Sequence, residues 1–567
     1  MHTYAIGLDF GTNSCRSLIV DCADGREIAS HVFGYPSGTL GVIVDPSDPM
    51  LARQNPRDYL LGVTVTITEA LKKASAADPS FSAERVIGIG VDTTGSCPMP
   101  VDTAGMPLCY DERFAADPAS MVWLWKDHTS HAEAAQITET GLRMRAEFLA
   151  KVGGTYSSEW FWSKVLHCKR TSPEVYAAAH SFVEICDWIP AVLCGETKPE
   201  LIKRSVCAAG HKAFFNADWG GLPDAEFLET LSPGLGSLRA RLYDKAYAAD
   251  ERAGFLSSEW CAKLGLGPNP VAVAVGSFDA HMGAVGAGVS PGTLVKIMGT
   301  STCDIMIAPS DEPLSDIKGV CGIVKNSVMN GYYGIEAGQS AVGDIFLWFV
   351  STLVPESWGA TPDEKFKNLE IGAGKLKPGE SGLLALDWNN GNRTVLVDAR
   401  LTGLLLGQTL STRVDEIYRA LIEATAFGAL TIIDRIESYG VKISEIVTCG
   451  GLASKNPVLM QIYADITGRP MKISRSDQTP ALGAAIFASV AAGTETGGHA
   501  SVAEASAAMT GVTTVYEPNA EHHATYEKLY ALYTQLHDAF GTRQDAGSLY
   551  SVMKSLLDIR DAARSAR

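Results

Sequence analysis

The sequence predicts an α/β protein built from two related domains that face a shared cleft. Residues 4–21 form a strand, a tight polar turn and a second strand, with both strands rich in Ile, Leu and Val. A similar segment recurs 288 residues later, at 294–308. The chain has 567 residues, 46% of them hydrophobic, which is enough to fill the cores of two or more domains.

The turn of the first segment, DFGTNSCR, has the features of a phosphate-binding hairpin. Gly11 allows a ligand to approach the backbone closely, and Thr12 and Asn13 bring side-chain and backbone donors together. Asp9 and Arg16 flank the turn, and the carboxylate of Asp9 suits the shell of a magnesium ion, reached through a water molecule. An ordinary hairpin with a polar turn is the alternative for this segment taken alone.

The second copy favours the functional interpretation, because it keeps the turn and changes its flanks. The pairs Gly11/Gly299, Thr12/Thr300 and Cys15/Cys303 are identical when the two segments are aligned at this offset. Asp9 and Arg16 are replaced by Ile297 and Asp304. We therefore predict that the first turn organises a metal and that the second, which ends at Ser301, makes plain phosphate contacts, both turned toward one cleft.

Charge and cysteine content exclude several classes of protein. The formal net charge of −17 argues against nucleic acid or an anionic membrane surface as the main partner. Twelve scattered cysteines without a CxxC pair predict free thiols in a reducing compartment. The chain starts with a strand, and runs of about 18 apolar residues are absent from the sequence. We therefore expect a soluble cytoplasmic protein with no nucleic-acid or membrane partner.

The first half continues with elements that place polar groups at a sheet edge. Residues 26–36 predict a third strand, and 58–77 a helix with apolar spacing. Residues 84–96 predict a buried strand whose carboxyl end, DTTGS, lies where open α/β sheets bind ligands. Residues 105–270 are an expected insertion of helices and aromatic-rich loops, and the aromatic cluster at 155–170 is interpreted mainly as core.

The hinge between the halves is expected after residue 270, with domains at 1–285 and 286–567. There an apolar strand runs into Asp279, His281 and a glycine-rich helix start. A carboxylate at a strand end between two phosphate turns suits a general base, and a helix cap is the alternative for Asp279. His281 follows two residues later, so a strand end would point both side chains alike. We assign it a structural role in place of a Ser-His-Asp arrangement.

The second half predicts a further sheet with glycine-rich strand ends. We expect a strand that ends at Glu336 with a helix after it, and then a long helix at 415–440 that is closed by Gly440 as its C′ residue. A strand at 445–449 and a small-residue helix at 479–493 follow. At the end of the chain we expect a docking helix at 526–540 and a frayed segment at 560–567. Gly450 and Gly451 follow the buried strand at 445–449. A double glycine there lets a flat ring lie against the backbone.

An ordered set of motifs extends these expectations. GVDTTGSCPMPVD, LWKDHTSH, YSSEWFWSK, AGHK, FDAHMGAVGAG, MGTSTCDI and EAGQSAVGD occur in this order over nearly the whole chain. In this set the sequence resembles the FGGY carbohydrate kinases, and within them the bacterial kinases of L-ribulose. The resemblance implies two actin-like, ribonuclease H-like ATPase domains flanking a nucleotide and sugar cleft. It also implies ATP- and magnesium-dependent formation of L-ribulose 5-phosphate in L-arabinose catabolism.

The resemblance also implies roles for single residues. It makes Asp279 the catalytic base and gives the sugar contacts as Gly95, Ser96, Trp125, Lys212, Asp279 and Glu336. It gives the ATP contacts as Gly11, Thr12, Asn13, Arg16, Gly299, Thr300, Ser301, Gly343, Gly450, Gly451 and Asn456, with Asp9 at the metal. Without the resemblance, Lys212 would be interpreted as a solvated lysine, and Glu336 stays ambiguous.

Other functions remain open at this stage. An actin- or chaperone-like ATPase would use the same phosphate turns without a small-molecule acceptor, although the large insertion favours an acceptor. Among kinases, D-ribulose, D-xylulose or ribitol are alternative acceptors. His128, His131 and His211 could suggest a metal site, but the sequence offers no second cluster at ligand spacing. The partners expected are ATP and a ketopentose, with a homodimer left open.

Overall fold

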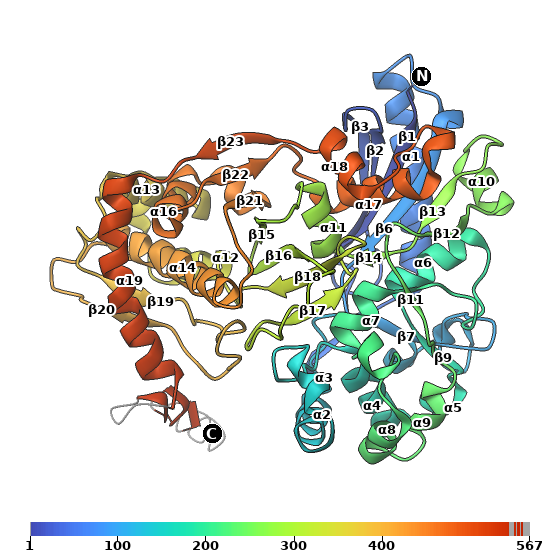
Figure 1. Cartoon of the computed structure of the whole chain (residues 1–567), viewed down its shortest axis with the longest axis horizontal. Coiled ribbons are helices and arrows are strands. Elements are labelled where there is room, and N and C mark those ends of the chain that lie inside the picture. Colours follow the sequence, from blue (N-terminus) through green and yellow to red (C-terminus); the bar gives the residue numbers. More distant parts are fainter. Residues whose placement is uncertain (1, 544–548, 552, 556, 559–567) are drawn as a thin grey trace.

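The computed structural model describes residues 2–543, 549–551, 553–555, 557 and 558. It confirms an α/β protein with two lobes, each built on a seven-stranded sheet (Figure 1). The first sheet has the order β12 (Arg252–Phe255), β13 (Ala272–Ala274), β6 (Val86–Thr93), β1 (Tyr4–Phe10), β2 (Ser14–Asp21), β3 (Glu27–Gly34), with β14 (Ser277–Phe278) also paired to β6. The second has the order β23 (Val512–Tyr516), β22 (Met471–Ser474), β21 (Glu445–Cys449), β15 (Thr293–Met298), β16 (Thr302–Pro309), β18 (Tyr332–Ala337), β17 (Gly322–Lys325).

The two sheets repeat one topology strand by strand. In each, a hairpin (β1–β2, β15–β16) pairs antiparallel with the next strand on one side. On the other side of the first sheet, β1 pairs parallel with β6, and β6 pairs parallel with β13. In the second sheet, β15 pairs parallel with β21, and β21 pairs parallel with β22. The duplication therefore extends beyond the predicted hairpin to five strands of each sheet.

The registers of the two hairpins differ, which corrects the alignment at an offset of 288. Phe10 pairs with Cys15 across the first turn, whereas Met298 pairs with Thr302 across the second. The second turn is one residue shorter, so the returning strands align at an offset of 287. Cys15 and Cys303, which match in the sequence, therefore do not occupy equivalent positions.

The insertion between β6 and β13 folds against the first sheet as a helical subdomain. Its main helices are α2 (His131–Met144), α4 (Phe161–Thr171), α6 (Ile185–Cys194) and α7 (Val206–Lys212). Tyr156, Trp160, Phe161 and Trp162 are buried in its core. The expectation that this aromatic run packs as core is confirmed.

Two helices meet where the lobes join, and each covers the sheet of the other half. α17 (Thr479–Ala492), from the second half, packs on β1, β6 and β13 of the first sheet. α11 (Asp279–Gly286), from the first half, contacts β15 and β16 of the second sheet and packs along α17. In Figure 1 both helices lie between the two sheets, and one apolar core joins them to strands of both.

Glycines allow these elements to pack backbone against backbone. A Cβ on Gly7 or Gly90 would lie 1.7 or 1.9 Å from a carbonyl oxygen of α17. A Cβ on Gly286 of α11 would lie 2.0 Å from the carbonyl oxygen of Thr479, and one on Gly483 of α17 would lie 1.8 Å from that of Met282. Larger residues at these positions would separate the layers.

The larger of the remaining helices surround the second sheet and the outer face of the first. They are α1 (Pro56–Ala77) on β2 and β3, then α12 (Gly343–Thr352), α13 (Pro362–Lys375), α14 (Val414–Glu437), α16 (Pro457–Thr467) and α19 (Ala520–Gly541). α14 ends with Ser438 as its C-cap, so Gly440 lies two residues beyond the cap and is not the predicted C′ residue. The end expected to fray, 560–567, lies outside the described residues.

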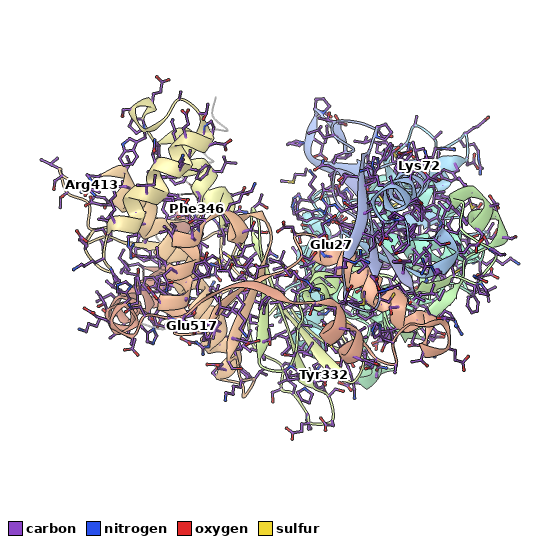
Figure 2. All side chains as sticks on the ribbon, turned by 90° about the horizontal axis from the view of Figure 1, so that it is seen from above. Glu27, Lys72, Tyr332, Phe346, Arg413 and Glu517 are labelled. Carbon is purple, nitrogen blue, oxygen red and sulfur yellow. The ribbon has the colours of Figure 1, made fainter. Side chains whose placement is uncertain are left out.

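Seen from above, the lobes are joined along one side (Figure 2). Phe346 and Arg413 lie in one lobe and Lys72 in the other, with Glu27 near the junction. Glu27 accepts hydrogen bonds from Ser476 Oγ (2.5 Å) and Gln478 Nε2 (3.1 Å), just before α17. All twelve cysteines are free, as predicted. Helices long and apolar enough to cross a membrane are absent from the described chain.

Candidate active site

Three carboxylates meet at one edge of the first sheet. Asp9 ends β1 beside Asp92 of β6, and Asp92 pairs with Ser277 of β14, which leads into Asp279. Asp92 was not among the predicted site residues. It is fully buried, and its carboxylate oxygens have no hydrogen-bond partner among the described residues. Burial and the negative charges of Asp9 and Asp279 raise the pKa of Asp92 well above its usual value.

Asp279 lies at the start of α11 without capping it. Phe278 is the N-cap residue, and the hydrogen bond that the Asp279 carboxylate accepts comes from the adjacent Ala280 N–H (2.7 Å). Burial, Asp9 and Glu336 raise the pKa of Asp279 to about 7, against the opposing effect of Lys212. A carboxylate with a pKa near neutrality is suited to accept a proton at physiological pH.

His281 lies in α11 and not at a strand end, which corrects the expected geometry. Residues two apart on a helix point to nearly opposite sides, so Asp279 and His281 do not share a face. Within the described chain the ring nitrogens of His281 have no hydrogen-bond partner. Nε2 lies 3.8 Å from Glu336 Oε2, so His281 borders the carboxylate and takes no part in a Ser-His-Asp arrangement.

Lys212 and Glu336 form a buried ion pair between the two lobes. Lys212 ends α7, and its Nζ lies 2.9 and 3.1 Å from the two carboxylate oxygens of Glu336 on β18. Their residues are 6% and 8% exposed, which excludes the interpretation of Lys212 as a solvated lysine. Burial alone would raise the pKa of Glu336, but Lys212, His211 and His281 hold it far below its usual value.

A cavity of about 450 Å³ opens beside this ion pair and is lined from both lobes. Tyr156 and Trp160 contribute aromatic faces from the insertion, and Asn390 and Arg393 contribute polar groups from the second half. Charged and aromatic groups around a cavity of this size are suited to a small polar ligand such as a sugar. Of the predicted sugar contacts, Lys212 and Glu336 line it. Gly95, Ser96, Trp125 and Asp279 are not among the described lining residues.

The segment 95–97 is fixed by groups that the sequence did not identify. Ser96 Oγ donates to the carboxylate of Glu184, which also accepts from the N–H of Cys97 (2.6 Å). Lys164 Nζ donates to the carbonyl oxygen of Ser96 (2.7 Å), and burial lowers the pKa of Lys164 to about 8. A Cβ on Gly95 would lie 1.9 Å from the ring of Phe278. The segment is therefore held close to Asp279.

The first phosphate turn, residues 11–13, is attached to its surroundings through Thr12. Trp125 Nε1 donates to Thr12 Oγ1 (3.0 Å), and Gln54 Nε2 donates to the Thr12 carbonyl oxygen (2.7 Å). Arg16 lies 3.5 Å from Asp9. Trp125, predicted as a sugar contact, is thus bonded to the predicted phosphate turn.

The second phosphate turn, residues 299–301, rests on the start of α12. The N–H of Gly343 donates to the carbonyl oxygen of Gly299 (3.1 Å), and the N–H of Val342 donates to that of Thr300 (2.9 Å). A Cβ on Gly343 would lie 2.5 Å from the Gly299 oxygen, so this approach requires glycine. A helix N-terminus beside the turn favours an anionic ligand.

The predicted adenosine contacts divide into two kinds. Gly450 has a φ of 99°, and a Cβ there would lie 2.4 Å from the carbonyl oxygen of Met298, while Gly451 faces open space among the described atoms. The open space at Gly451 fits the prediction that a flat ring lies against the backbone. Asn456 is buried, caps α16 by accepting from Leu459 N (2.9 Å) and donates to Tyr418 Oη (3.3 Å). Its side chain is therefore occupied by structural hydrogen bonds.

Asp92 begins the strand end DTTGS, which the sequence places at a ligand-binding position, and a second pattern marks it as a partner of Asp9. IGLD at 6–9 and IGVD at 89–92 repeat the same pattern, with the glycines facing α17 and the aspartates facing the site. Lys164 and Glu184 carried no comparable signal, because their importance comes from tertiary contacts with residues far away in the chain.

A Cys/His cluster lies next to Glu336. Cys207, His211 and His281 bring ligating atoms within 4.8 Å of one another. A Cβ on Gly322 would lie 2.2 Å from Nδ1 of His211, so the backbone of β17 occupies the position in front of that nitrogen. We interpret the cluster as part of the wall around Glu336 and not as a metal site.

Comparisons with known proteins agree with this geometry. Models of the N-terminal and C-terminal domains of the FGGY family of carbohydrate kinases match residues 4–286 and 294–492. A protein named ribulokinase from Shouchella clausii is 42% identical and covers 100% of this chain and 99% of its own. Ribulokinase from Halalkalibacterium halodurans is 43% identical, covering 98% of each. A crystal structure of xylulose kinase from Rhodospirillum rubrum matches with a TM-score of 0.77 at 20% identity, over 95% of this chain and 99% of that one, which supports the fold.

Proposed function

Since the chain belongs to the FGGY family of carbohydrate kinases, we propose that it phosphorylates L-ribulose with ATP, giving L-ribulose 5-phosphate in L-arabinose catabolism. Similarity to proteins named ribulokinase extends over the whole chain and supports this acceptor. Membership of a sugar kinase family excludes the rival of an ATPase without a small-molecule acceptor. Another ketopentose or polyol remains the second candidate acceptor.

The position of Asp279 carries the proposal. It interacts electrostatically with Asp9, which flanks the first phosphate turn. It also interacts with Lys212 and Glu336, which line the sugar cavity. Its carboxylate orients the primary hydroxyl of the sugar and takes its proton as that oxygen attacks the γ-phosphorus in line. Lys212 and Glu336 bind the remaining hydroxyls by charge-assisted hydrogen bonds.

The residues at the sheet edge fit a magnesium ion, which the family implies. Asp92 has two carboxylate oxygens without donors in the described structure, and it neighbours Asp9. Carboxylate oxygens with room for water are the ligands that magnesium prefers. We propose that Asp9, with Asp92 behind it, holds the ion through water. When bound, the ion would neutralise charge on the phosphates of ATP.

A coupled assay of ADP release over a panel of acceptors tests the proposal. L-ribulose should give the highest kcat/KM, with D-ribulose, D-xylulose and ribitol below it, and turnover without sugar should be slow. A higher kcat/KM on any other sugar would replace L-ribulose as the substrate. We further propose that the enzyme acts in the cytoplasm, where ATP is available, and its assembly as a homodimer stays a prediction.

A further inference from the structure

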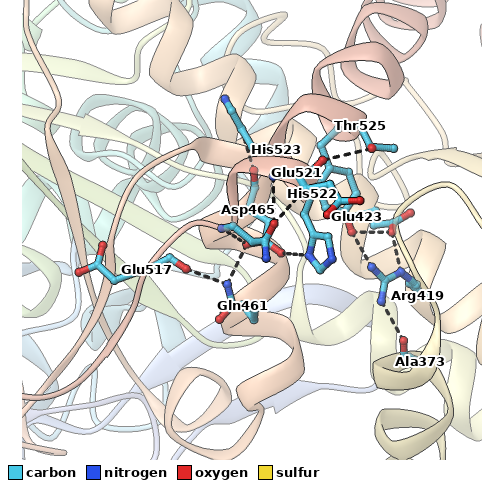
Figure 3. Close-up of polar contacts among 12 residues, drawn as sticks. Ala373, Arg419, Glu423, Gln461, Asp465, Glu517, Glu521, His522, His523 and Thr525 are labelled. Atoms are coloured by element: carbon cyan, nitrogen blue, oxygen red, sulfur yellow. Dashed lines mark hydrogen bonds and ion pairs between the residues drawn. The ribbon is translucent and has the colours of Figure 1, made fainter.

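The C-terminal helix α19 is attached to the second lobe by buried polar contacts. Asp465 of α16 accepts from the N–H of Asn519 (2.8 Å) and lies 2.8 Å from Nδ1 of His522 (Figure 3). Arg419 and Glu423 of α14 both bond the hydroxyl of Tyr526, at 2.7 and 2.9 Å. α19 follows the range matched by the C-terminal family model, which ends at residue 492.

One end of a hydrogen-bonded relay lies directly after the second phosphate turn. Thr302 follows that turn, and its N–H donates to the carbonyl oxygen of Gln339 (3.1 Å). The N–H of Gln339 donates back to Thr302 Oγ1 (3.0 Å). Two bonds between the same pair of residues fix the exit of the turn relative to the strand end that carries Glu336.

The relay continues from Gln339 to α19. Gln339 Nε2 donates to Asp387 Oδ2 (2.8 Å) and to the carbonyl oxygen of Thr425 (2.8 Å). Tyr533 of α19 donates its hydroxyl to the other oxygen of Asp387, Oδ1 (3.1 Å). Gln339, Asp387 and Tyr533 are at most 6% exposed, so water has little access to replace a lost bond.

A glycine in the middle of α14 makes room for the relay. A Cβ on Gly428 would lie 2.4 Å from Asp387 Oδ2 and 2.8 Å from Gln339 Nε2. Glycine inside a helix is less favourable than alanine, so its presence indicates a packing requirement. The requirement here is the Gln339–Asp387 bond itself.

We propose that Tyr533 of α19 is a positioning residue for the second phosphate turn, acting through Asp387, Gln339 and Thr302. Loss of the Tyr533 hydroxyl leaves one carboxylate oxygen of Asp387 without a donor in a buried site. Asp387 then shifts together with the Gln339 side chain that is bonded to it, and the Gln339 backbone, which holds Thr302 at the exit of the turn, shifts with them. The inference rests on the proposed contact between this turn and the phosphates of ATP.

Tyr530 supplies a matched control on the same helix. Its hydroxyl donates to Asp434 Oδ2 (2.8 Å) and lies 3.3 Å from Thr431 Oγ1, both on α14. Its ring stacks on that of Tyr533, with centroids 6.0 Å apart, but its hydroxyl is bonded to Asp434 and not to Asp387. Tyr530→Phe therefore removes a phenolic hydroxyl from α19, one helical turn from Tyr533, and leaves the path to the turn intact.

The experiment compares Tyr533→Phe with Tyr530→Phe in the full-length chain. Steady-state kinetics with L-ribulose should show the KM for ATP raised roughly 3- to 10-fold in Tyr533→Phe, the range expected for one buried hydrogen bond, with the KM for sugar unchanged. Tyr530→Phe should keep the wild-type KM for ATP. Calorimetric titration of ADP without sugar should show weaker ADP binding in Tyr533→Phe and wild-type binding in Tyr530→Phe. A purely structural effect would lower the melting temperature of both variants without separating their affinities for ADP.

A second variant approaches the relay from the opposite side. Gly428→Ala places a methyl group against Asp387 and Gln339 and leaves Tyr533 unsubstituted. It should also raise the KM for ATP. If Tyr533→Phe does not yield folded protein, this variant decides. An unchanged KM for ATP in the folded variants, or an equal rise in Tyr530→Phe, overturns the inference. A wild type that does not phosphorylate sugars would instead refute the proposed function.

Discussion

At the scale of single residues, the sheet edge sets the charge of its three carboxylates. Burial and the neighbouring carboxylates raise the pKa of Asp92 well above its usual value, and they raise the pKa of Asp279 to about 7. Asp9, which Arg16 approaches, is partly exposed, and burial raises its pKa against the effect of Arg16. We therefore propose different roles for the three: Asp279 as the base, Asp9 in the shell of the metal ion, and Asp92 as the support behind Asp9.

Asp279→Asn should lose at least about 10²-fold in kcat, because the amide keeps the shape of the carboxylate but cannot take a proton. Because the pKa of Asp279 is raised in the folded state, its ionised form lowers the free energy of unfolding. The contribution of this residue to stability is therefore lost as the pH rises from the usual range of a carboxylate toward 7. At pH 8 the variant should melt no lower than the wild type. A kcat within a factor of about ten of wild type would refute the role of base.

The pH profile of the wild type should reflect the same group. Protonated Asp279 cannot act as a base, so kcat/KM for sugar should fall tenfold per pH unit below about 7 and level off above it. The low-pH limb should be absent from the residual activity of Asp279→Asn. A profile that stays flat from pH 5 to pH 8 would contradict the assignment.

Asp9→Asn should raise the magnesium concentration needed for half-maximal activity far more than it raises the KM for sugar, since the lost charge faces the cation. Asp92→Asn is the matched control. Asp92 is fully buried behind Asp9, and burial raises its pKa well above the usual value, so its amide variant should have the smaller effect. An unchanged magnesium requirement in Asp9→Asn would exclude it from the ion's shell.

At the scale of elements, the sequence predicted the two hairpins and several of the helices. Strand and helix periodicity are local signals, and they located β1, β2, α1 and α14 to within a few residues. The one-residue difference between the hairpins was hidden, because the match of Cys15 with Cys303 concealed a shorter turn. The segment 95–97 depends on Lys164 and Glu184, whose contacts arise only when the insertion folds against the sheet.

The packing of α11 on α17 gives an element-scale prediction with an internal control. Gly286→Ala should lower the stability of the protein by about 1 to 3 kcal/mol, because its Cβ would meet the Thr479 oxygen at 2.0 Å. Gly283→Ala on the same helix should be neutral or stabilising, since its nearest neighbour is at 3.5 Å. Thermal melts of both variants test this. Equal melting temperatures would contradict it.

At the scale of the whole molecule, the Lys212–Glu336 pair joins the two lobes at the sugar cavity. Replacing either residue by Ala should cost about 1.5 to 3 kcal/mol in affinity for the ketopentose, with ATP affinity nearly unchanged. The double variant should lose less than the sum, because each single change leaves an unpaired buried charge. Calorimetric titrations of sugar and of ATP measure both effects. Equal losses for sugar and ATP would reject these residues as sugar contacts.

The exchange of α11 and α17 between the lobes has a consequence for synthesis of the chain. The first sheet is complete in sequence by residue 278, but the helix that covers β1 and β6 ends at Ala492. A ribosome must therefore translate more than two hundred further residues before the apolar face of this sheet can be covered by its own chain. During that interval the nascent first lobe exposes Gly7, Gly90 and their apolar neighbours to solvent or to a chaperone. A gene cut between the halves would yield fragments that fold only when produced together.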